Sequence, residues 1–298
     1  MLVRMIIFLS LGALGFWIYD KIQDEFSYAN ITFDQPLAAD WDLPPLPLDK
    51  LNVVDSILNQ KFTYLDKGRQ SYAFLSEDGK YVIKFIKFTY LKPPLWVRFP
   101  SFPFLKTFQN KWKKGQRKRL ERIFSGYQLA YSYDKENSGL IYIHLKQPEM
   151  KNKKVTVIDR FRLTTTLDLE SILFILQEKG IQTKQVFKEL RKRGDLTMLK
   201  LRIGQILELY VSEYQKGLYD SDHNVLANTA FTGNGFIRID AGRLKFDERM
   251  KNPLVFKEDL RKVTHGRLAK WIKSNFPADE KEILEEMEKM VHDLIKSL

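Results

Sequence analysis

The segment KGLYDSDHNVLANTAFTGNGFIRIDAG, residues 216–242, decides how the rest of the chain is interpreted. Between Asn228 and Asp240 lies the run TAFTGNGFIRI, which predicts a β-hairpin, because Asn-Gly between two apolar runs is a strong hairpin signal. Such a hairpin brings Asn228 and Asp240 to the same end. An amide oxygen and a carboxylate that converge in this way suit Mg²⁺, which takes oxygen ligands together with substrate phosphates.

The same segment resembles the catalytic region of the protein-kinase-like superfamily. Kinases read K-G-[IV]-x-H-R-D-x-x-x-x-N, then a short strand pair, then [IV]-D-F-G. Here Lys216-Gly217-Leu218 matches the opening, and Ile239-Asp240-Ala241-Gly242 stands for the second motif. The resemblance therefore covers both halves of the segment in the correct order.

The resemblance implies that Asp222 is the catalytic residue that receives the substrate proton, and that Asn228 and Asp240 hold Mg²⁺. Two departures from the family pattern concern the base. Asp220 replaces the histidine, and the spacing from Asp222 to Asn228 is one residue longer than in the family. Asp220 is therefore a second candidate for the catalytic base. The alternative interpretation is an ordinary acidic turn, in which Asp and Asn satisfy local hydrogen bonds.

Upstream, three apolar runs predict strands at residues 62–65, 72–75 and 81–85. They resemble the kinase glycine-rich hairpin and the strand that carries V-A-I-K. Gly68 keeps the middle glycine, whereas Asp66 and Ser71 replace the outer two. The resemblance implies that Lys84 contacts the ATP phosphates and that Gly68 and Ser71 line the nucleotide. Because backbone N–H groups must approach phosphate closely, the loss of two glycines weakens the case for ordinary ATP binding.

Residues 116–133 carry apolar side chains at helical spacing and occupy the place of the family's αC helix. Glu121 is the candidate partner of Lys84 in the ion pair that holds the lysine toward phosphate. A glutamate on the surface among arginines is the alternative. Residues 139–145 and 154–158 predict two more strands, and residues 159–161 the crossover to the second lobe.

The remainder is predicted to be helical at residues 167–180, 184–193, 196–216, 256–276 and 278–298, with Asp195 as the N-cap of the third helix. We therefore expect an α+β, two-lobed protein-kinase-like fold. Its amino-terminal lobe, residues 49–160, has five antiparallel strands and an αC-like helix. Its carboxy-terminal lobe, residues 161–298, is mainly helical and smaller than in a typical protein kinase.

The chain starts with an apolar run behind Arg4, which predicts an uncleaved membrane anchor within residues 1–26, with a cleaved signal peptide as the alternative. A Pro-rich linker covers residues 27–48. Residues 91–119 combine aromatic and basic side chains, which suits an anionic membrane surface or, as a competitor, nucleic acid. The net charge of +12 favours anionic partners, and the absence of Cys excludes disulfides and thiolate chemistry.

Three functions fit these patterns. The first is a membrane-associated kinase-like phosphotransferase that uses Mg-ATP and an acceptor of unknown class. The second is a catalytically inactive kinase-fold protein, a pseudokinase that acts as a binding or scaffold module. The third is a basic nucleic-acid-binding protein, which residues 91–119 favour.

Overall fold

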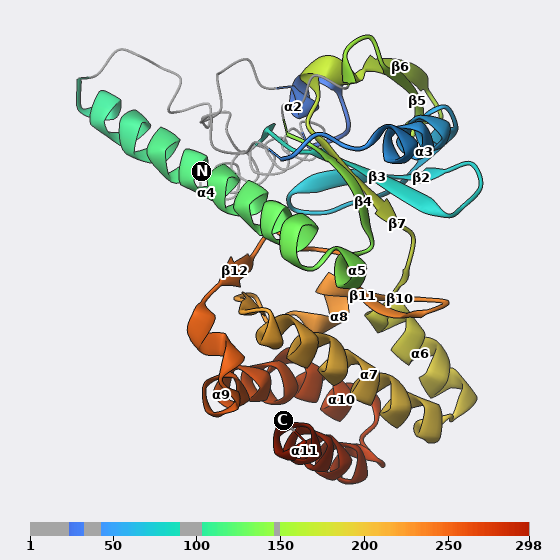
Figure 1. The fold of residues 1–298 in the computed structure, drawn as a ribbon, viewed down its shortest axis with the longest axis vertical. Coiled ribbons are helices and arrows are strands. Elements are labelled where there is room, and N and C mark those ends of the chain that lie inside the picture. Colours follow the sequence, from blue (N-terminus) through green and yellow to red (C-terminus); the bar gives the residue numbers. More distant parts are fainter. Residues whose placement is uncertain (1–23, 33–42, 90–102, 146–149, 298) are drawn as a thin grey trace, which may run out of the picture.

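The chain folds into two lobes, one built on a large β-sheet and one built mainly of helices (Figure 1). The structure is a computed structural model, and it describes residues 24–32, 43–89, 103–145 and 150–297. We call residues 24–178 the sheet lobe and residues 181–297 the helical lobe. This arrangement confirms the predicted α+β, two-lobed, protein-kinase-like fold.

The sheet lobe contains α2 (Tyr28–Ile31), α3 (Leu48–Leu58), β1 (Lys61–Lys67), β2 (Ser71–Ser76), β3 (Tyr81–Ile86), α4 (Pro103–Tyr133), α5 (Lys135–Ser138), β4 (Leu140–His144), β5 (Lys154–Ile158), β6 (Thr164–Asp168), the 3₁₀ turn η4 (Leu169–Ser171) and β7 (Phe174–Glu178). The helical lobe contains β8 (Ile181–Gln182), α6 (Thr183–Arg193), α7 (Leu196–Gln215), β9 (Leu218–Asp220), α8 (Val225–Asn228), β10 (Thr229–Thr232), β11 (Gly235–Arg238), β12 (Leu244–Phe246), the 3₁₀ turn η5 (Glu248–Lys251), α9 (Pro253–Val263), the π-helical turn η6 (Thr264–Leu268), α10 (Ala269–Asn275) and α11 (Glu280–Lys296).

The sheet has seven strands in the order β4-β7-β3-β2-β1-β5-β6, not the predicted five. From β4 to β1 every neighbouring pair is antiparallel. The predicted antiparallel arrangement is wrong for β5, which pairs in parallel with β1 and forms a hairpin with β6. The two strands that were not predicted are β7, which lies between β4 and β3, and β6, which lies at the edge of the sheet beyond β5.

The predicted helix over residues 167–180 is wrong, because this stretch holds the end of β6, the turn η4 and the strand β7. Four successive residues of β7, Phe174–Gln177, are buried, since the strand lies inside the sheet with both faces covered. A short apolar run of this kind does not distinguish a buried strand from a buried helix.

The predicted crossover at residues 159–161 is also displaced. Asp159 accepts hydrogen bonds from the backbone N–H groups of Phe161 (2.8 Å) and Leu163 (2.9 Å), which makes the tight turn between β5 and β6. The chain instead leaves the sheet after Glu178 and descends into β8 and α6 (Figure 1). The predicted division at residue 160 thus falls inside the sheet.

Helix α4 joins the two lobes. It begins well before the predicted residue 116, and its inner face buries Leu120, Ile123, Phe124 and Tyr127. These side chains share one apolar cluster with residues of β4 and with Ala241 and Leu244 of the helical lobe. Figure 1 shows α4 running along the underside of the sheet lobe, above β12.

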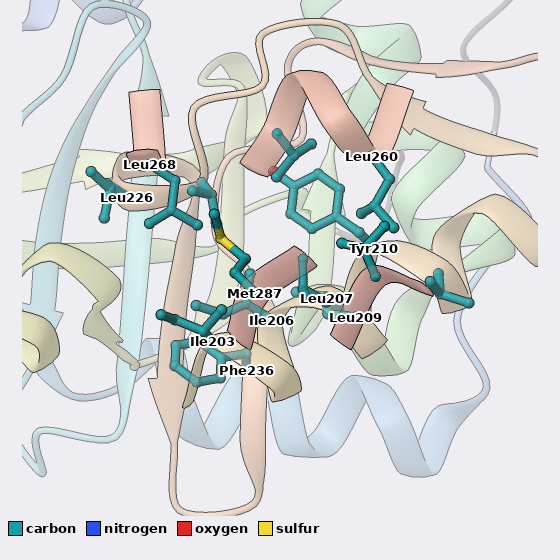
Figure 2. Packing of buried hydrophobic residues seen from close by; sticks show 14 of the residues in the cluster. Ile203, Ile206, Leu207, Leu209, Tyr210, Leu226, Phe236, Leu260, Leu268 and Met287 are labelled. Atoms are coloured by element: carbon teal, nitrogen blue, oxygen red, sulfur yellow. The ribbon is translucent and has the colours of Figure 1, made fainter. Parts of the chain in front are cut away.

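The helical lobe is organised around α7, whose N-cap Asp195 accepts a hydrogen bond from the backbone N–H of Met198 (2.9 Å), as predicted. Side chains from α7 meet side chains from α9 and α11 in one core (Figure 2). The predicted helix over residues 256–276 is broken into α9, η6 and α10, because Gly266 leaves helical geometry inside η6.

The localisation predicted from the sequence, a membrane association through an N-terminal anchor, is corrected. In the part of the chain that the structure describes, no helix combines the length and the apolar composition needed to cross a bilayer. The residues of the predicted anchor up to 23 lie outside the described ranges, as do residues 91–102 of the predicted anionic-partner segment.

Candidate functional site

The predicted hairpin between Asn228 and Asp240 forms from β10 and β11. Thr232 pairs with Gly235 across a two-residue turn, and Thr229 pairs with Arg238 at the other end. Beyond that end, the carbonyl of Asn228 accepts hydrogen bonds from the backbone N–H groups of Ile239 (2.8 Å) and Asp240 (3.3 Å). The structure therefore brings Asn228 and Asp240 together, as the hairpin prediction required.

Lys84 reaches from the sheet lobe to the helical lobe. Its Nζ donates a hydrogen bond to Gln177 Oε1 on β7 (2.7 Å) and another to the carbonyl oxygen of Ile239. Burial lowers the pKa of Lys84 to about 8, against the opposing charge of nearby Asp240. The lysine of β3 and the carboxylate that follows β11 thus face each other across the boundary between the lobes.

A cavity of about 260 Å³ lies beside Lys84. Its lining includes Ala73 and Val82 of the sheet. It also includes Glu178, Lys179 and Gly180, where the chain passes between the lobes. A concave space with convergent polar groups is the usual form of a small-molecule pocket. The lining of this cavity combines apolar side chains with polar and charged ones, Lys84 among them.

Helix α4 holds the Asp240 segment in place through two neighbouring residues. The hydroxyl of Tyr127 donates to the Asp240 carboxylate and accepts from the backbone N–H of Ala241, and burial next to this carboxylate raises the pKa of Tyr127 well above its usual value. At Gly126, a Cβ would lie 2.1 Å from the carbonyl oxygen of Ala241, so only glycine permits this approach. Sequence reasoning missed both residues, although an isolated glycine inside a helical pattern is a signal of close packing.

The predicted ion pair between Glu121 and Lys84 is absent. Glu121 instead pairs with Arg117, one helical turn away, at 3.3 Å. The reason is the orientation of α4, which turns Phe124 and Tyr127 inward and leaves Glu121 partly exposed at the edge. Helix α4 therefore contacts the Asp240 segment through Tyr127 rather than through Glu121.

The loop between β1 and β2 closes over the site from above. The N–H of Gly68 donates to the carbonyl of Ser71 (2.9 Å), which makes the turn tight. The side chain of Gln70 reaches Gly242, where a Cβ would lie 2.3 Å from Gln70 Oε1. The loop thus touches the segment after Asp240, and the predicted nucleotide contacts of Gly68 and Ser71 stay predictions.

The two candidates for the base have different environments. Asp220 is buried, with 1% of its surface exposed, and it binds the Arg238 guanidinium at 2.8 Å and the Asn228 side-chain amide at 3.1 Å. Asp222 is 24% exposed at its side chain. A base must reach the acceptor hydroxyl, so Asp222 is the accessible candidate and Asp220 is part of an internal ion network.

The donor atoms near Asp240 fit a hard cation. The side-chain nitrogen of Asn228 is turned to Asp220, which leaves the amide oxygen as the ligand atom. Asp240 supplies carboxylate oxygens that Tyr127 and the Gly242 N–H orient, the latter at 3.0 Å from Oδ1. Within the described ranges, no cluster of three or more His, Asp and Glu side chains could bind a metal alone. Such a site suits Mg²⁺, which keeps waters and substrate phosphates in its coordination sphere.

Comparison with known proteins gives likeness at the level of structure. No protein-family model and no curated protein matches the sequence. A crystal structure of WbdD aligns with 77% of this chain and 45% of its own at 12% identity and a TM-score of 0.38. A second one, described as the bifunctional kinase-methyltransferase WbdD, aligns over 75% and 43% at 12% identity and a TM-score of 0.36. The streptomycin–ATP–APH(2″)-IIa ternary complex aligns over 84% and 99% at 15% identity and a TM-score of 0.27.

The chain spans less than half the length of the WbdD structures that it matches. The kinase-like character stated here rests on features of the chain itself. These features are the antiparallel order from β4 to β1, Lys84 on β3, and the Asn228–Asp240 contact. Together with the two-lobed α+β architecture, these features resemble a kinase fold.

The charge of Lys84 gives a prediction for nucleotide binding. Because its pKa lies at about 8, Lys84 loses its proton as the pH rises above that value. We expect the affinity for Mg-ATP to fall roughly tenfold between about pH 7 and about pH 9.5, since a hydrogen bond to a charged group contributes about 1.5–3 kcal/mol. Isothermal titration calorimetry across this range measures the change.

The matched control is Lys84→Met, which should bind Mg-ATP more weakly and with little dependence on pH. The free energy of unfolding changes with pH in the opposite direction to the affinity for Mg-ATP. The folded chain binds fewer protons than the unfolded chain between pH 8 and 10.5, so Lys84 makes the fold more stable as the pH rises through this window. An affinity that stays constant up to pH 9.5 would contradict the assigned contact.

Proposed function

We propose that the protein is a kinase-fold phosphotransferase that uses Mg-ATP and transfers the γ-phosphate to a hydroxyl acceptor. One observation carries the proposal. Lys84 of the sheet lobe donates a hydrogen bond to the carbonyl oxygen of Ile239, the residue before Asp240. Both Lys84 and Ile239 line the cavity between the lobes. A cation near a carboxylate at the boundary between the lobes provides the parts needed to hold a nucleoside triphosphate with its metal.

Each residue has a role that its surroundings support. Lys84 binds phosphate oxygens, and Asn228 and Asp240 hold Mg²⁺, which neutralises charge on the phosphates when it is bound. Tyr127 keeps the Asp240 carboxylate in one orientation through its hydroxyl. Asp222 orients the acceptor hydroxyl and receives its proton. Catalysis then consists of positioning and electrostatic stabilisation.

The experiment that tests the proposal replaces Asp222. Asp222→Asn should lower phosphoryl transfer from ATP to small hydroxyl compounds by about 100-fold or more, because a general base contributes about 10²–10⁴-fold. Binding of Mg-ATP should be unchanged, since the residues proposed to bind the nucleotide and its metal are Lys84, Asn228 and Asp240. Transfer is measured with ATP labelled at the γ-phosphate.

The control is Asp195→Asn, which makes the same chemical change away from the site and keeps an N-cap residue on α7. Its transfer rate should equal that of the parent. Equal transfer by Asp222→Asn and the parent would remove Asp222 from the reaction.

A second candidate function, a kinase-fold protein without catalysis, is supported by the β1–β2 loop. Gln70 lies against Gly242, where a kinase needs room for the phosphates. Within the described structure Gln70 Oε1 is buried and has no hydrogen-bond partner. If Gln70 blocks the phosphate position, the parent will bind no Mg-ATP whereas Gln70→Ala, which lacks the blocking side chain, will bind it, and this outcome would favour the non-catalytic function.

A further inference from the structure

Two arginines converge on the proposed base. Arg243 Nη1 lies 3.5 Å from Asp222 Oδ1, and Arg267 Nη1 lies 3.8 Å from the same oxygen. Both separations exceed the 2.7–2.9 Å of a charge-assisted N–H···O hydrogen bond. The side chains of Arg243 and Arg267 are 34% and 56% exposed. Their guanidinium donors are therefore oriented toward Asp222 without being bound tightly by it.

Separate parts of the helical lobe place these two arginines. Arg243 follows Gly242, and its carbonyl accepts hydrogen bonds from the N–H (3.3 Å) and the hydroxyl (3.1 Å) of Ser221, next to Asp222. Arg267 lies in η6, between α9 and α10, and η6 packs against α8, the short helix that follows Asp222. Two separate segments of the backbone thus each place a guanidinium group near the Asp222 carboxylate.

The neighbouring carboxylates already have their own cations or donors. Asp259 is bound by His223 at 2.8 Å and by Tyr214 at 3.0 Å, and Asp220 is bound by Arg238. Around the partly exposed Asp222, two guanidinium groups face one carboxylate, so this group of three side chains carries a net positive charge. A planar guanidinium fork matches the geometry of a carboxylate or a phosphate.

We propose that the acceptor is an anionic alcohol, a small molecule whose phosphate or carboxylate group is bound by Arg243 and Arg267. This inference rests on the proposed function, since it names the substrate class of the same site. The hydroxyl that Asp222 orients must lie within hydrogen-bond distance of its carboxylate. The arginines approach that same carboxylate, so the anionic group and the reacting hydroxyl are only a few bonds apart.

A matched series of compounds on one carbon skeleton tests the charge preference. Glycerol is neutral, glycerol 3-phosphate and glycerate are anionic, and 3-amino-1,2-propanediol is cationic. Binding of each compound to the full chain is measured by calorimetry without nucleotide. We expect the two anionic compounds to bind at least about tenfold more tightly than glycerol, and the cationic compound to bind no better than glycerol.

Substitution of the arginines then locates the binding. Arg243→Gln and Arg267→Gln should each weaken binding of glycerol 3-phosphate about tenfold or more and leave Mg-ATP binding unchanged. Arg261→Gln is the control, because Arg261 of α9 is similarly exposed but pairs with Glu258 at 3.1 Å. Its affinity for glycerol 3-phosphate should match that of the parent.

The experiments distinguish a failure of the proposed function from a failure of the inference about the acceptor. If the parent binds no Mg-ATP, the proposed function fails, and the acceptor role fails with it. If Mg-ATP binds but the series shows no preference for negative charge, only the inference about the acceptor is overturned. If the arginine variants lose Mg-ATP binding instead of glycerol 3-phosphate binding, the pair contacts the nucleotide, and this result also overturns the inference.

Discussion

Replacing Asp240 with asparagine is expected to lower Mg²⁺-dependent turnover of ATP by about 100-fold or more while the chain stays folded. The substitution removes the negative charge that would bind Mg²⁺, and electrostatic stabilisation is commonly the largest contribution to catalysis. The amide oxygen of the new side chain can still accept hydrogen bonds from Tyr127 and from the Gly242 N–H. The measurement is Mg²⁺-dependent release of phosphate from ATP, compared with the melting temperature of the same sample.

Asp195→Asn again provides the control, because it changes a carboxylate to an amide at a helix N-cap outside the cleft. Its turnover should equal that of the parent. Full turnover by Asp240→Asn would show that this carboxylate does not hold the metal, and the assignment of the site would be wrong.

Replacing Arg238 with methionine is expected to have the largest effect on stability, about 3–5 kcal/mol of unfolding free energy. Arg238 is 1% exposed and binds Glu213 at 2.5 Å and Asp220 at 2.8 Å, and both carboxylates are buried. Without the guanidinium, two buried negative charges have no compensating cation, which is the costly way to break a buried ion pair. Chemical denaturation of parent and variant measures the loss.

The loss should depend on pH. Burial raises the pKa of Glu213 from 4.5 to about 7, and Arg238 opposes this rise, so its removal raises the pKa further. A carboxyl whose folded pKa lies above its unfolded value contributes less stability as the pH rises between the two. The deficit of the variant should therefore be small near pH 4.5 and grow toward pH 8. The same deficit at both pH values would contradict the role of Glu213.

The control for Arg238→Met is Arg249→Met. The side chain of Arg249 is 82% exposed, although it also pairs with a carboxylate, that of Asp247, at 2.6 Å. Exposed ion pairs contribute about 0–1 kcal/mol, so this variant should be close to the parent in stability. The comparison separates burial of the charge from the mere presence of an ion pair.

The sequence was sufficient where local chemistry determines structure. The hairpin around Gly233 and Asn234 and the N-cap Asp195 appear as predicted, because each depends on residues that are close in sequence. Lys84 was placed correctly on the third strand for the same reason. These elements contain the core of the candidate site.

The sequence alone did not predict the features that depend on contacts between segments far apart in the chain. The strand β7 was interpreted as a helix, because burial on both faces removes the alternation that marks a strand. Glu121 was chosen from its place in the helix, but the packing of α4 against Ala241 turns Tyr127 toward Asp240 instead. The rotation of α4 depends on Gly126, whose close approach to Ala241 joins segments far apart in the chain.

The same limit applied to the choice between Asp220 and Asp222. Both carboxylates lie in one short loop, and their spacing alone did not separate them. The two carboxylates differ because the Arg238 guanidinium of β11 binds Asp220, which lies buried in an ion network. A buried arginine in an alternating strand gives no such signal in sequence, where it is expected to face solvent.

The central claim is that the cavity beside Lys84 and Asp240 binds a nucleotide together with Mg²⁺. The most direct test is the melting temperature of the full chain with ATP, with Mg²⁺, with both and with neither. Ligand at a hundred times its dissociation constant adds about 2.7 kcal/mol to stability, which corresponds to a shift of a few degrees. The account predicts this shift only when ATP and Mg²⁺ are both present. No shift under any condition, or the same shift with ATP alone, would contradict it.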